Sequence, residues 1–246
     1  MHALVVYAHP EPSSFAGALK DTAVATLSAR GHAVEVSDLY AERFNPLAGR
    51  HDFLTEADPA RFHYQTEQLH AATSKGFAAD LHREQARVAR ADLMVFVSPI
   101  WWGGVPAILK GWFDRVMAYG FAYADGKRFD SGYFRGRRAL MGLCTGGTAE
   151  RFSDEGAYGH IDRVLYPVRH CILEYLGLEV LPPFVAYGVP RVSAGARRDY
   201  LDAWSGRLAA AIDDPVWQSS ARNSSSEFAQ RVSTGLTTGA AWTRPS

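Results

Sequence analysis

Short apolar runs alternate along this chain with longer segments in which apolar residues recur at helical spacing. The apolar runs predict five strands, at residues 4–7, 32–36, 93–97, 139–143 and 180–187. The periodic segments predict helices at residues 15–30, 81–90, 105–119, 161–176 and 194–213. Uninterrupted apolar runs are typical of parallel strands that are buried on both faces. We therefore expect an α/β fold: a doubly wound sheet of five parallel strands, in the order 2-1-3-4-5, with helices on both faces.

Two segments interrupt this alternation. Residues 39–81 form a long mixed stretch, and its aromatic residues favour an ordered, functional insertion over a disordered one. After residue 219, Ser, Thr, Gly and Ala predominate. We expect a catalytic domain at residues 1–214 and a tail at 215–246 that is either flexible or packed on a partner subunit through Phe228, Val232 and Trp242.

The charge balance narrows the range of partners. The 26 Lys and Arg residues equal the 26 Asp and Glu residues, so the formal net charge is zero. This argues against nucleic acid or an anionic membrane as a partner. The N-terminus carries no cationic segment typical of a secretion signal. The uncharged stretch 93–109 is interrupted by prolines and glycines, which predicts a strand, a loop and a helix rather than a membrane span.

The two cysteines give a further expectation about location. Cys144 and Cys171 fit no metal-binding spacing and are too few for a disulfide framework. We therefore expect no metal site and a reducing, cytoplasmic location.

The loop after the third predicted strand carries the most informative residues. Pro99, Ile100, Trp101, Trp102 and Gly103 stand at the carboxyl end of that strand. Ligands bind at such ends in open α/β sheets. Indole rings supply flat apolar walls, and glycines let the backbone approach a ring closely. This loop therefore predicts a site for a planar cofactor such as a flavin.

Two further loops are expected at the same edge of the sheet. After the first strand, Ser13 and Ser14 either hold a phosphate at the start of a helix or simply cap that helix. After the fourth strand, Gly146 and Gly147 either point N–H groups at a ligand or form an ordinary tight turn. The chain lacks the G-x-G-x-x-G and G-x-x-x-x-G-K-S/T motifs. Together the three loops offer a phosphate end, a ring wall and a hydrogen-bonding edge, as a flavin site requires.

Several longer motifs carry a resemblance to a known family. They are AHPEPSSF at 8–15, SDLYA at 37–41, FNP at 44–46, DPARF at 58–62, GVPAILKGWF at 104–113, FAY at 121–123 and TGG at 145–147. The chain resembles the NAD(P)H:quinone oxidoreductase (DT-diaphorase-like) family of flavoproteins with a flavodoxin-like fold. The resemblance spans about residues 3–214.

The resemblance implies bound FAD rather than FMN, NAD(P)H as electron donor, and two-electron reduction of quinones; whether azo and nitro compounds are also acceptors is left open by the sequence. It also implies a homodimer with shared active sites and a ping-pong reaction. The residues that it assigns to the cofactor are His9, Ser14, Phe15, Ala16, His63, Pro99, Ile100, Trp101, Trp102, Gly103, Cys144, Thr145, Gly146, Gly147, Phe152 and Arg197. Those that it assigns to the substrate pocket are Ala122, Tyr123, Ala124 and Tyr175, with Tyr123 supplied by the other subunit.

The chain departs from the family pattern at several of these positions. Phe152 and Tyr158 stand where the family has a tyrosine and a histidine, and Asp125 replaces a second pocket tyrosine. Reduced flavin carries negative charge at its N1/O2 edge, where hydrogen-bond donors accelerate the reaction. We expect the N–H groups of Gly146 and Gly147 and the Tyr158 phenol to be these donors, with His160 as the alternative to Tyr158.

Two other classes of function remain as alternatives. One is a regulatory flavoprotein subunit of a membrane transporter. The other is a one-electron carrier of the flavodoxin type, against which the neutral charge balance counts.

Overall fold

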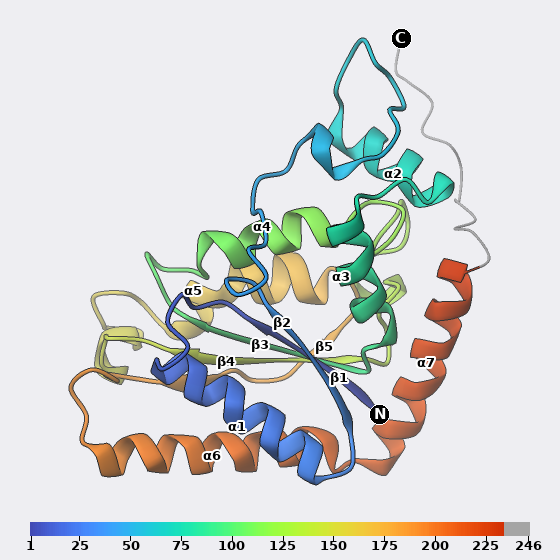
Figure 1. The fold of residues 1–246 in the computed structure, drawn as a ribbon. Helices are drawn as coiled ribbons and strands as arrows, with labels where there is room; N and C mark the ends of the chain where they lie inside the picture. The colour runs from blue at the N-terminus through green and yellow to red at the C-terminus, as the bar shows by residue number, and fades with distance from the viewer. Residues whose placement is uncertain (234–246) are drawn as a thin grey trace.

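A parallel β-sheet lies between two layers of helices in the computed structural model, which describes residues 1–233 (Figure 1). The strands are β1 (His2–Tyr7), β2 (Ala33–Asp38), β3 (Leu93–Pro99), β4 (Arg138–Cys144), β5 (Glu179–Val180) and β6 (Phe184–Ala186). All pairs are parallel, the order is β2-β1-β3-β4-β5, and β6 pairs with β4 beyond the end of β5. The predicted order and doubly wound topology are confirmed.

The fifth predicted strand, residues 180–187, is two short strands instead of one. Leu181 still donates its N–H to the Ala139 carbonyl at 2.9 Å, but Pro182 and Pro183 follow. Proline has no N–H to donate to a ladder, so pairing stops there and resumes at Phe184.

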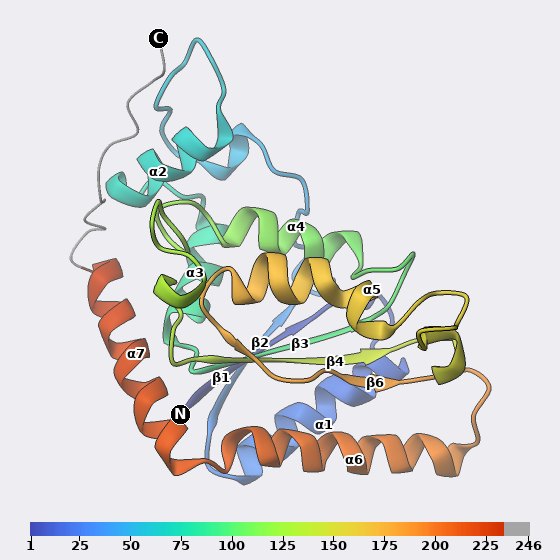
Figure 2. The same cartoon turned by 180° about the vertical axis from the view of Figure 1, so that it is seen from behind.

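Helices cover both faces of the sheet (Figures 1 and 2). One face carries α1 (Phe15–Ala29) and α6 (Ala194–Ile212), and the other carries α3 (Ala79–Arg90), α4 (Ala107–Val116) and α5 (Ile161–Val168). Alternate residues of β1 pack against the two helix layers, because successive side chains of a strand point to opposite faces of the sheet. Val5 and Tyr7 pack in the cluster that contains Trp204, whereas Leu4 and Val6 pack in the cluster that contains Trp112.

The predicted helix at 161–176 changes its winding part-way. It is α-helical to Val168 and continues as a π-helix, η4 (Arg169–Glu174). Pro167 lies just before the change.

Residues 39–78 are ordered by a buried charge cluster around Asp52, which lies in the short helix η1 (Arg50–Asp52). Arg115 of α4 donates to one Asp52 carboxylate oxygen at 2.9 and 2.6 Å. The Tyr64 hydroxyl, at the start of α2 (Tyr64–Ser74), donates to the other at 2.6 Å. Burial together with this bond to Asp52 raises the pKa of the Tyr64 phenol. The insertion is therefore tied to α4.

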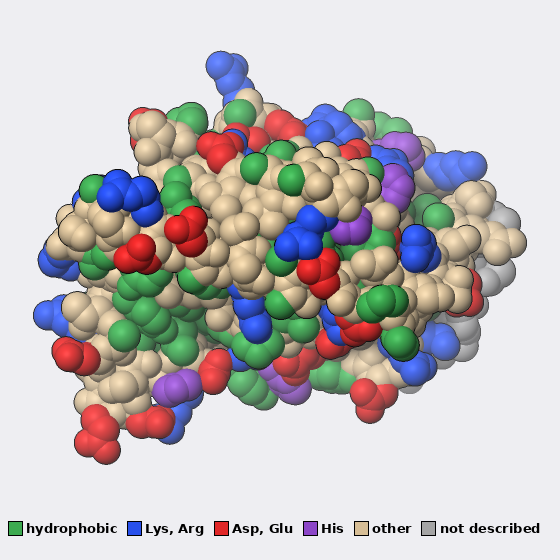
Figure 3. Space-filling view, turned by 90° about the horizontal axis from the view of Figure 1, so that it is seen from below, with side chains coloured by type: hydrophobic (Ala, Val, Ile, Leu, Met, Phe, Trp, Pro, Cys, Tyr) green, Lys and Arg blue, Asp and Glu red, His purple; other side chains and the backbone are tan. Residues whose placement is uncertain are grey.

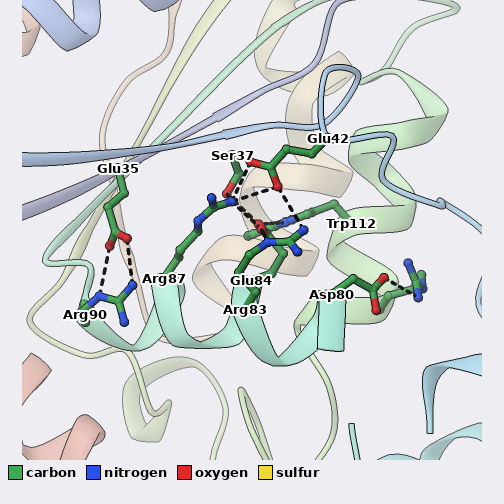
Figure 4. Close-up of polar contacts among 10 residues, drawn as sticks. Glu35, Ser37, Glu42, Asp80, Arg83, Glu84, Arg87, Arg90 and Trp112 are labelled. Atoms are coloured by element: carbon green, nitrogen blue, oxygen red, sulfur yellow. Dashed lines mark hydrogen bonds and ion pairs between the residues drawn. The ribbon is translucent and has the colours of Figure 1, made fainter. Parts of the chain in front are cut away.

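A second buried cluster surrounds Glu84 and joins β2, α3 and α4 (Figure 4). The fully buried Glu84 carboxylate accepts hydrogen bonds from Ser37 at 2.6 Å, Arg87 at 2.6 Å and the Trp112 indole at 2.9 Å. Arg87 also pairs with Glu42 at 2.9 Å. The cluster fixes the α3–α4 layer against the edge of the sheet.

The C-terminal segment departs from its prediction. Residues 215–233 form α7 (Pro215–Ser233), which lies beside the amino-terminal ends of the strands (Figure 1). Phe228 is buried, with its ring 5.4 Å from Phe121 and 4.8 Å from Phe134 of its own chain. The expectation of a flexible tail is therefore wrong for these residues, and Phe228 belongs to the core of its own chain. Trp242 lies outside the described residues.

Charges of both signs are interspersed over the face of the molecule that α1 and α6 form (Figure 3), in keeping with the zero net charge. Within residues 1–233, no helix combines the length and the apolar character that crossing a membrane requires.

Candidate active site

The loops after β1, β3 and β4 meet at the carboxyl edge of the sheet, on the left in Figure 1. Backbone hydrogen bonds hold them in register: Ala8 N–H to Val97 C=O at 3.0 Å, and Ile100 N–H to Cys144 C=O at 2.9 Å. Thr145 then donates to Ala186 at 3.0 Å. The strand order therefore brings the three predicted loops together.

The loop after β1 leads directly into α1. Ser14 caps this helix, and its hydroxyl oxygen accepts from the Gly17 N–H at 3.1 Å. A hydroxyl that accepts one bond can still donate another, so the capping role leaves a phosphate contact open to Ser14. The His9 ring lies 5.9 Å from the Trp101 ring, which joins this loop to the next. Phe15 packs edge-on against Tyr200 of α6, and Ala16 is buried beneath the loop.

The loop after β3 is a tight turn closed by reciprocal backbone hydrogen bonds between Trp101 and Gly104, at 2.9 and 3.1 Å. Its two central residues, Trp102 and Gly103, have φ angles of 51° and 71°. A non-glycine residue seldom adopts this left-handed conformation, which costs energy. The Trp102 side chain is fully exposed. A strained turn that presents an indole to solvent indicates a surface that meets a ligand or a second chain.

The loop after β4 forms a close-packed floor. The Gly147 N–H donates to the Thr145 hydroxyl at 3.1 Å. In this conformation the N–H therefore stabilises the loop and does not point at a ligand. A Cβ atom on Gly147 would lie 2.7 Å from the Phe152 ring. Glycine is therefore required at 147 by the packing of Phe152, which a sequence motif alone does not reveal.

Tyr158, rather than His160, faces the space above this floor. The Tyr158 side chain is half exposed, its ring is 5.1 Å from the Phe152 ring, and its hydroxyl accepts a hydrogen bond from Arg151 at 3.2 Å. His160 caps α5 instead, where its ring nitrogen accepts from the Asp162 N–H at 3.3 Å.

A cavity of about 550 Å³ opens between the loops after β3 and β4. Eight of the predicted site residues line it: Ile100, Trp102, Gly103, Thr145, Gly146, Gly147, Phe152 and Tyr158. Sequence reasoning missed Arg151, Val164 and Arg191, which also line it. The position of Arg151 next to Phe152 could have suggested the first. Nothing in the sequence places Arg191 there, because the fold alone brings residues 188–192 to this edge.

A second cavity, of about 710 Å³, contains three other predicted residues: His63, Tyr123 and Tyr175. The Tyr123 ring lies 5.6 Å from the Tyr175 ring, and its hydroxyl accepts from the Gln65 amide at 3.5 Å. Burial raises the pKa of the Tyr123 phenol. The predicted neighbours Ala122 and Ala124 are buried, so their side chains stay inside the fold.

The remaining predicted residues lie outside both cavities. Pro99 and Cys144 are buried at the paired ends of β3 and β4. Arg197, near the start of α6, donates to the Val192 carbonyl at 3.1 Å. Trp101 is partly exposed beside His9.

The two cysteines are expected to react very differently with a thiol reagent. Burial raises the pKa of the Cys144 thiol to about 12, so at pH 8 it is protonated as well as shielded, whereas Cys171 is exposed. Since the thiolate is the nucleophile, Ellman's reagent should titrate one thiol in the folded protein and two in denaturant. Cys171→Ser should abolish the fast thiol. Fast reaction of two thiols in the folded protein would contradict the burial of Cys144.

The 550 Å³ cavity fits the ring system of a flavin in size and chemistry. Its volume falls within the range of small-molecule sites. Ile100 and Phe152 supply an apolar surface, and Thr145 and Gly146 supply a polar edge. Cβ atoms added at Gly103 or Gly104 would meet nothing within 4 Å, so the backbone here borders open space that a ring can approach.

Comparisons with known proteins agree with this geometry. The family model for the flavodoxin-like fold matches residues 1–208. Ribosyldihydronicotinamide dehydrogenase (quinone) of Mus musculus is 43% identical over 206 residues, which cover 83% of this chain and 89% of the mouse protein. NAD(P)H dehydrogenase (quinone) 1 of Rattus norvegicus is 39% identical over 219 residues, which cover 89% of this chain and 78% of the rat protein. The chain belongs to the NAD(P)H:quinone oxidoreductase family. This confirms the resemblance and the flavodoxin-like fold that the motifs predict.

A solved structure also places the chain among quinone reductases. A candidate quinone reductase from Klebsiella pneumoniae matches with a TM-score of 0.83 and 38% identity, covering 87% of this chain and 85% of that one. The match to the flavodoxin-like family model ends at residue 208, before α7 begins at Pro215.

Proposed function

We propose that this protein is an FAD-dependent NAD(P)H:quinone oxidoreductase that reduces its acceptor by two electrons in a ping-pong reaction. The cavity between the loops after β3 and β4 carries this proposal, because it combines an apolar wall, a glycine-lined edge and a phenol at the end of a parallel sheet. The names of the mouse and rat relatives support quinones as acceptors.

The chain's own residues have distinct roles in this reaction. Ser14 and the first N–H groups of α1 bind the cofactor phosphates. Ile100 and Trp102 line the ring, exclude water from one side and orient the incoming substrate. The Tyr158 hydroxyl donates a hydrogen bond where negative charge develops, and Arg151 holds that hydroxyl in place. When bound, the flavin supplies the capacity to accept a hydride from one substrate and pass it to the next.

One set of measurements tests both the cofactor and the activity. We expect purified protein to show the visible absorbance of a bound flavin, chromatography of the released cofactor to show FAD, and NAD(P)H oxidation to depend on added menadione. A released FMN peak would remove His63 and Arg197 from the cofactor site. A flavin-loaded protein without turnover, bound stably to a membrane protein, would instead favour a regulatory subunit.

We also infer a homodimer that shares its active sites. Tyr123 and Tyr175 line one cavity of the chain and Tyr158 lines another, which fits a dimer in which each subunit completes the other's site. The fully exposed Trp102 beside the Tyr158 cavity is available to such a partner. Sedimentation at micromolar concentration should show one dimeric species. A fully active monomer would contradict shared sites.

A further inference from the structure

A groove of about 560 Å³ lies between α7 and the segment that leads into β4, residues 127–136. Because this segment ends just before β4 begins, the groove lies at the amino-terminal edge of the sheet, opposite the loops that form the flavin cavity (Figures 1 and 2). Six polar side chains border it: Lys127, Arg135, Ser220, Asn223, Glu227 and Arg231. The groove has the size of a small-molecule site, and the proposed reaction uses none of these side chains.

Positive charge predominates along this groove. Arg231 is its most enclosed cation, with the guanidinium carbon 3.6 Å from the Tyr133 ring centre. The side chains of Lys127 and Arg135 are exposed and form no ion pair or hydrogen bond within residues 1–233. Among the described residues, Glu227 is the only carboxylate that borders the groove, and it is in no ion pair. Three cations therefore border the groove together with one anion.

Other carboxylates near Arg135 do not neutralise it. Arg135 also borders a neighbouring cavity, which three carboxylates line: Asp130, Glu174 and Glu179. Glu174 pairs with His170 at 2.7 Å, and Glu179 pairs with Arg138 at 2.9 Å. Within the part of the chain that the structure describes, none of the three forms an ion pair with Arg135.

A fully buried cation, Arg137, lies behind the groove. The Phe228 ring, which borders the groove, has its centre 4.6 Å from the Arg137 guanidinium carbon and 4.7 Å from that of Arg231. In residues 1–233 the Arg137 Nε and Nη2 atoms have no hydrogen-bond partner. Burial lowers the pKa of Arg137 to about 9 and that of Arg231 to about 10, so both remain cations at neutral pH. Asp92 offsets part of the Arg137 charge, and an anion in the groove would offset more of it.

The α7 side of the groove offers hydrogen-bonding groups for a neutral, hydroxylated part of a ligand. The Ser220 hydroxyl and the Asn223 amide form no hydrogen bond within the described chain. The Glu227 carboxylate accepts hydrogen bonds only. It would repel a bare phosphate ion, whereas it can accept from the hydroxyl groups of a sugar. A ligand that suits both parts of the groove carries a phosphate and neighbouring hydroxyl groups.

We propose that the groove between α7 and residues 127–136 binds a sugar phosphate. Lys127 and Arg135 bind the phosphate oxygens, because ammonium and guanidinium groups form strong charge-assisted hydrogen bonds with them. Asn223 and Glu227 bind the sugar hydroxyls. The proposal does not rest on the proposed function, since the groove and the flavin cavity lie at opposite edges of the sheet.

A binding experiment tests this proposal without turnover. Titration calorimetry on protein saturated with FAD, whose own phosphate site is then filled, compares ribose 5-phosphate with ribose and with inorganic phosphate. We expect ribose 5-phosphate to bind at least about tenfold more tightly than either, as one additional charge-assisted contact provides. The double variant of Lys127→Met and Arg135→Gln should lose this binding. Arg222→Gln removes an exposed arginine of α7 that lies outside the groove, and this matched control should keep it.

Glu227→Ala tests the sugar part separately. It should reduce the preference for ribose 5-phosphate over inorganic phosphate, because it removes both an acceptor for hydroxyls and a charge that repels phosphate. Adenosine 5′-monophosphate contains the same ribose phosphate: tighter binding than ribose 5-phosphate would identify the ligand as a nucleotide, and equal binding would identify it as a free sugar phosphate. Equal affinity of the parent for ribose 5-phosphate and inorganic phosphate, or unchanged binding in the double variant, overturns the proposal.

Discussion

Replacing Glu84 with alanine is expected to lower the free energy of unfolding by about 3–5 kcal/mol, the usual effect of removing one partner from a buried charge cluster. The fully buried Glu84 carboxylate accepts from Ser37, Arg87 and Trp112. Alanine would leave the Trp112 N–H and the Ser37 hydroxyl without this acceptor inside the protein, and would leave Glu42 as the only carboxylate partner of Arg87. An unpaired buried donor carries its full desolvation penalty.

The matched control is Glu35→Ala, which breaks the exposed ion pair with Arg90 (2.8 Å) drawn in the same view (Figure 4). An exposed pair contributes about 1 kcal/mol or less. Urea unfolding followed by tryptophan fluorescence measures both variants, and the m-value should stay constant so that the midpoints can be compared. Equal losses of stability in the two variants would contradict this prediction. They would show that the Glu84 cluster does not stabilise the packing of α3 and α4 against β2.

The same cluster shows why the sequence predicts some parts of this fold and not others. The buried strand at residues 93–97 is visible in the sequence because its signal is local: five consecutive apolar residues. Glu84 gives no such signal. A glutamate in a helix is ordinarily solvated, and its burial here depends on Ser37 and Trp112, each at least 28 positions away in the chain.

Helix α7 escaped prediction for a related reason. Its buried positions are Trp217, Ala221, Ser225 and Phe228, at helical spacing, but two of the four are small residues in a serine-rich background. Composition therefore indicated a flexible tail. The helix forms because Phe228 finds the aromatic surface of Phe121 and Phe134, which tertiary structure alone creates.

The candidate site was predictable to the extent that it depends on loops at strand ends. The strand order brought Ile100 and Thr145 to one cavity, as the loop positions suggested. The cations Arg151 and Arg191 were not predictable, because surface arginines are common and only the fold turns these two toward the cavity. The pair of cavities, one with Tyr158 and one with Tyr123, likewise follows from tertiary structure.

The second large effect is expected at Tyr158. Tyr158→Phe should slow reduction of the flavin by NAD(P)H by about 10²-fold or more, the usual result of removing one preorganised donor from a site of developing negative charge. The phenylalanine ring can keep its packing against Phe152, since only the hydroxyl is lost. Flavin content should therefore change little, and stopped-flow absorbance of the flavin gives the rate of this half-reaction directly.

His160→Ala is the control that separates the two residues able to replace the missing family histidine. His160 lies two positions away but caps α5 outside the cavity, so its loss should cost part of a helix cap, about 1 kcal/mol of stability, and little rate. The midpoint potential of the bound flavin is a second measurement, which should not change if Tyr158 only packs against its neighbours. It should fall in Tyr158→Phe, because the variant stabilises the reduced, negatively charged form less. If Tyr158→Phe is reduced as fast as the parent and His160→Ala is slow, His160 is the donor, and the rim of the cavity must rearrange when the cofactor binds.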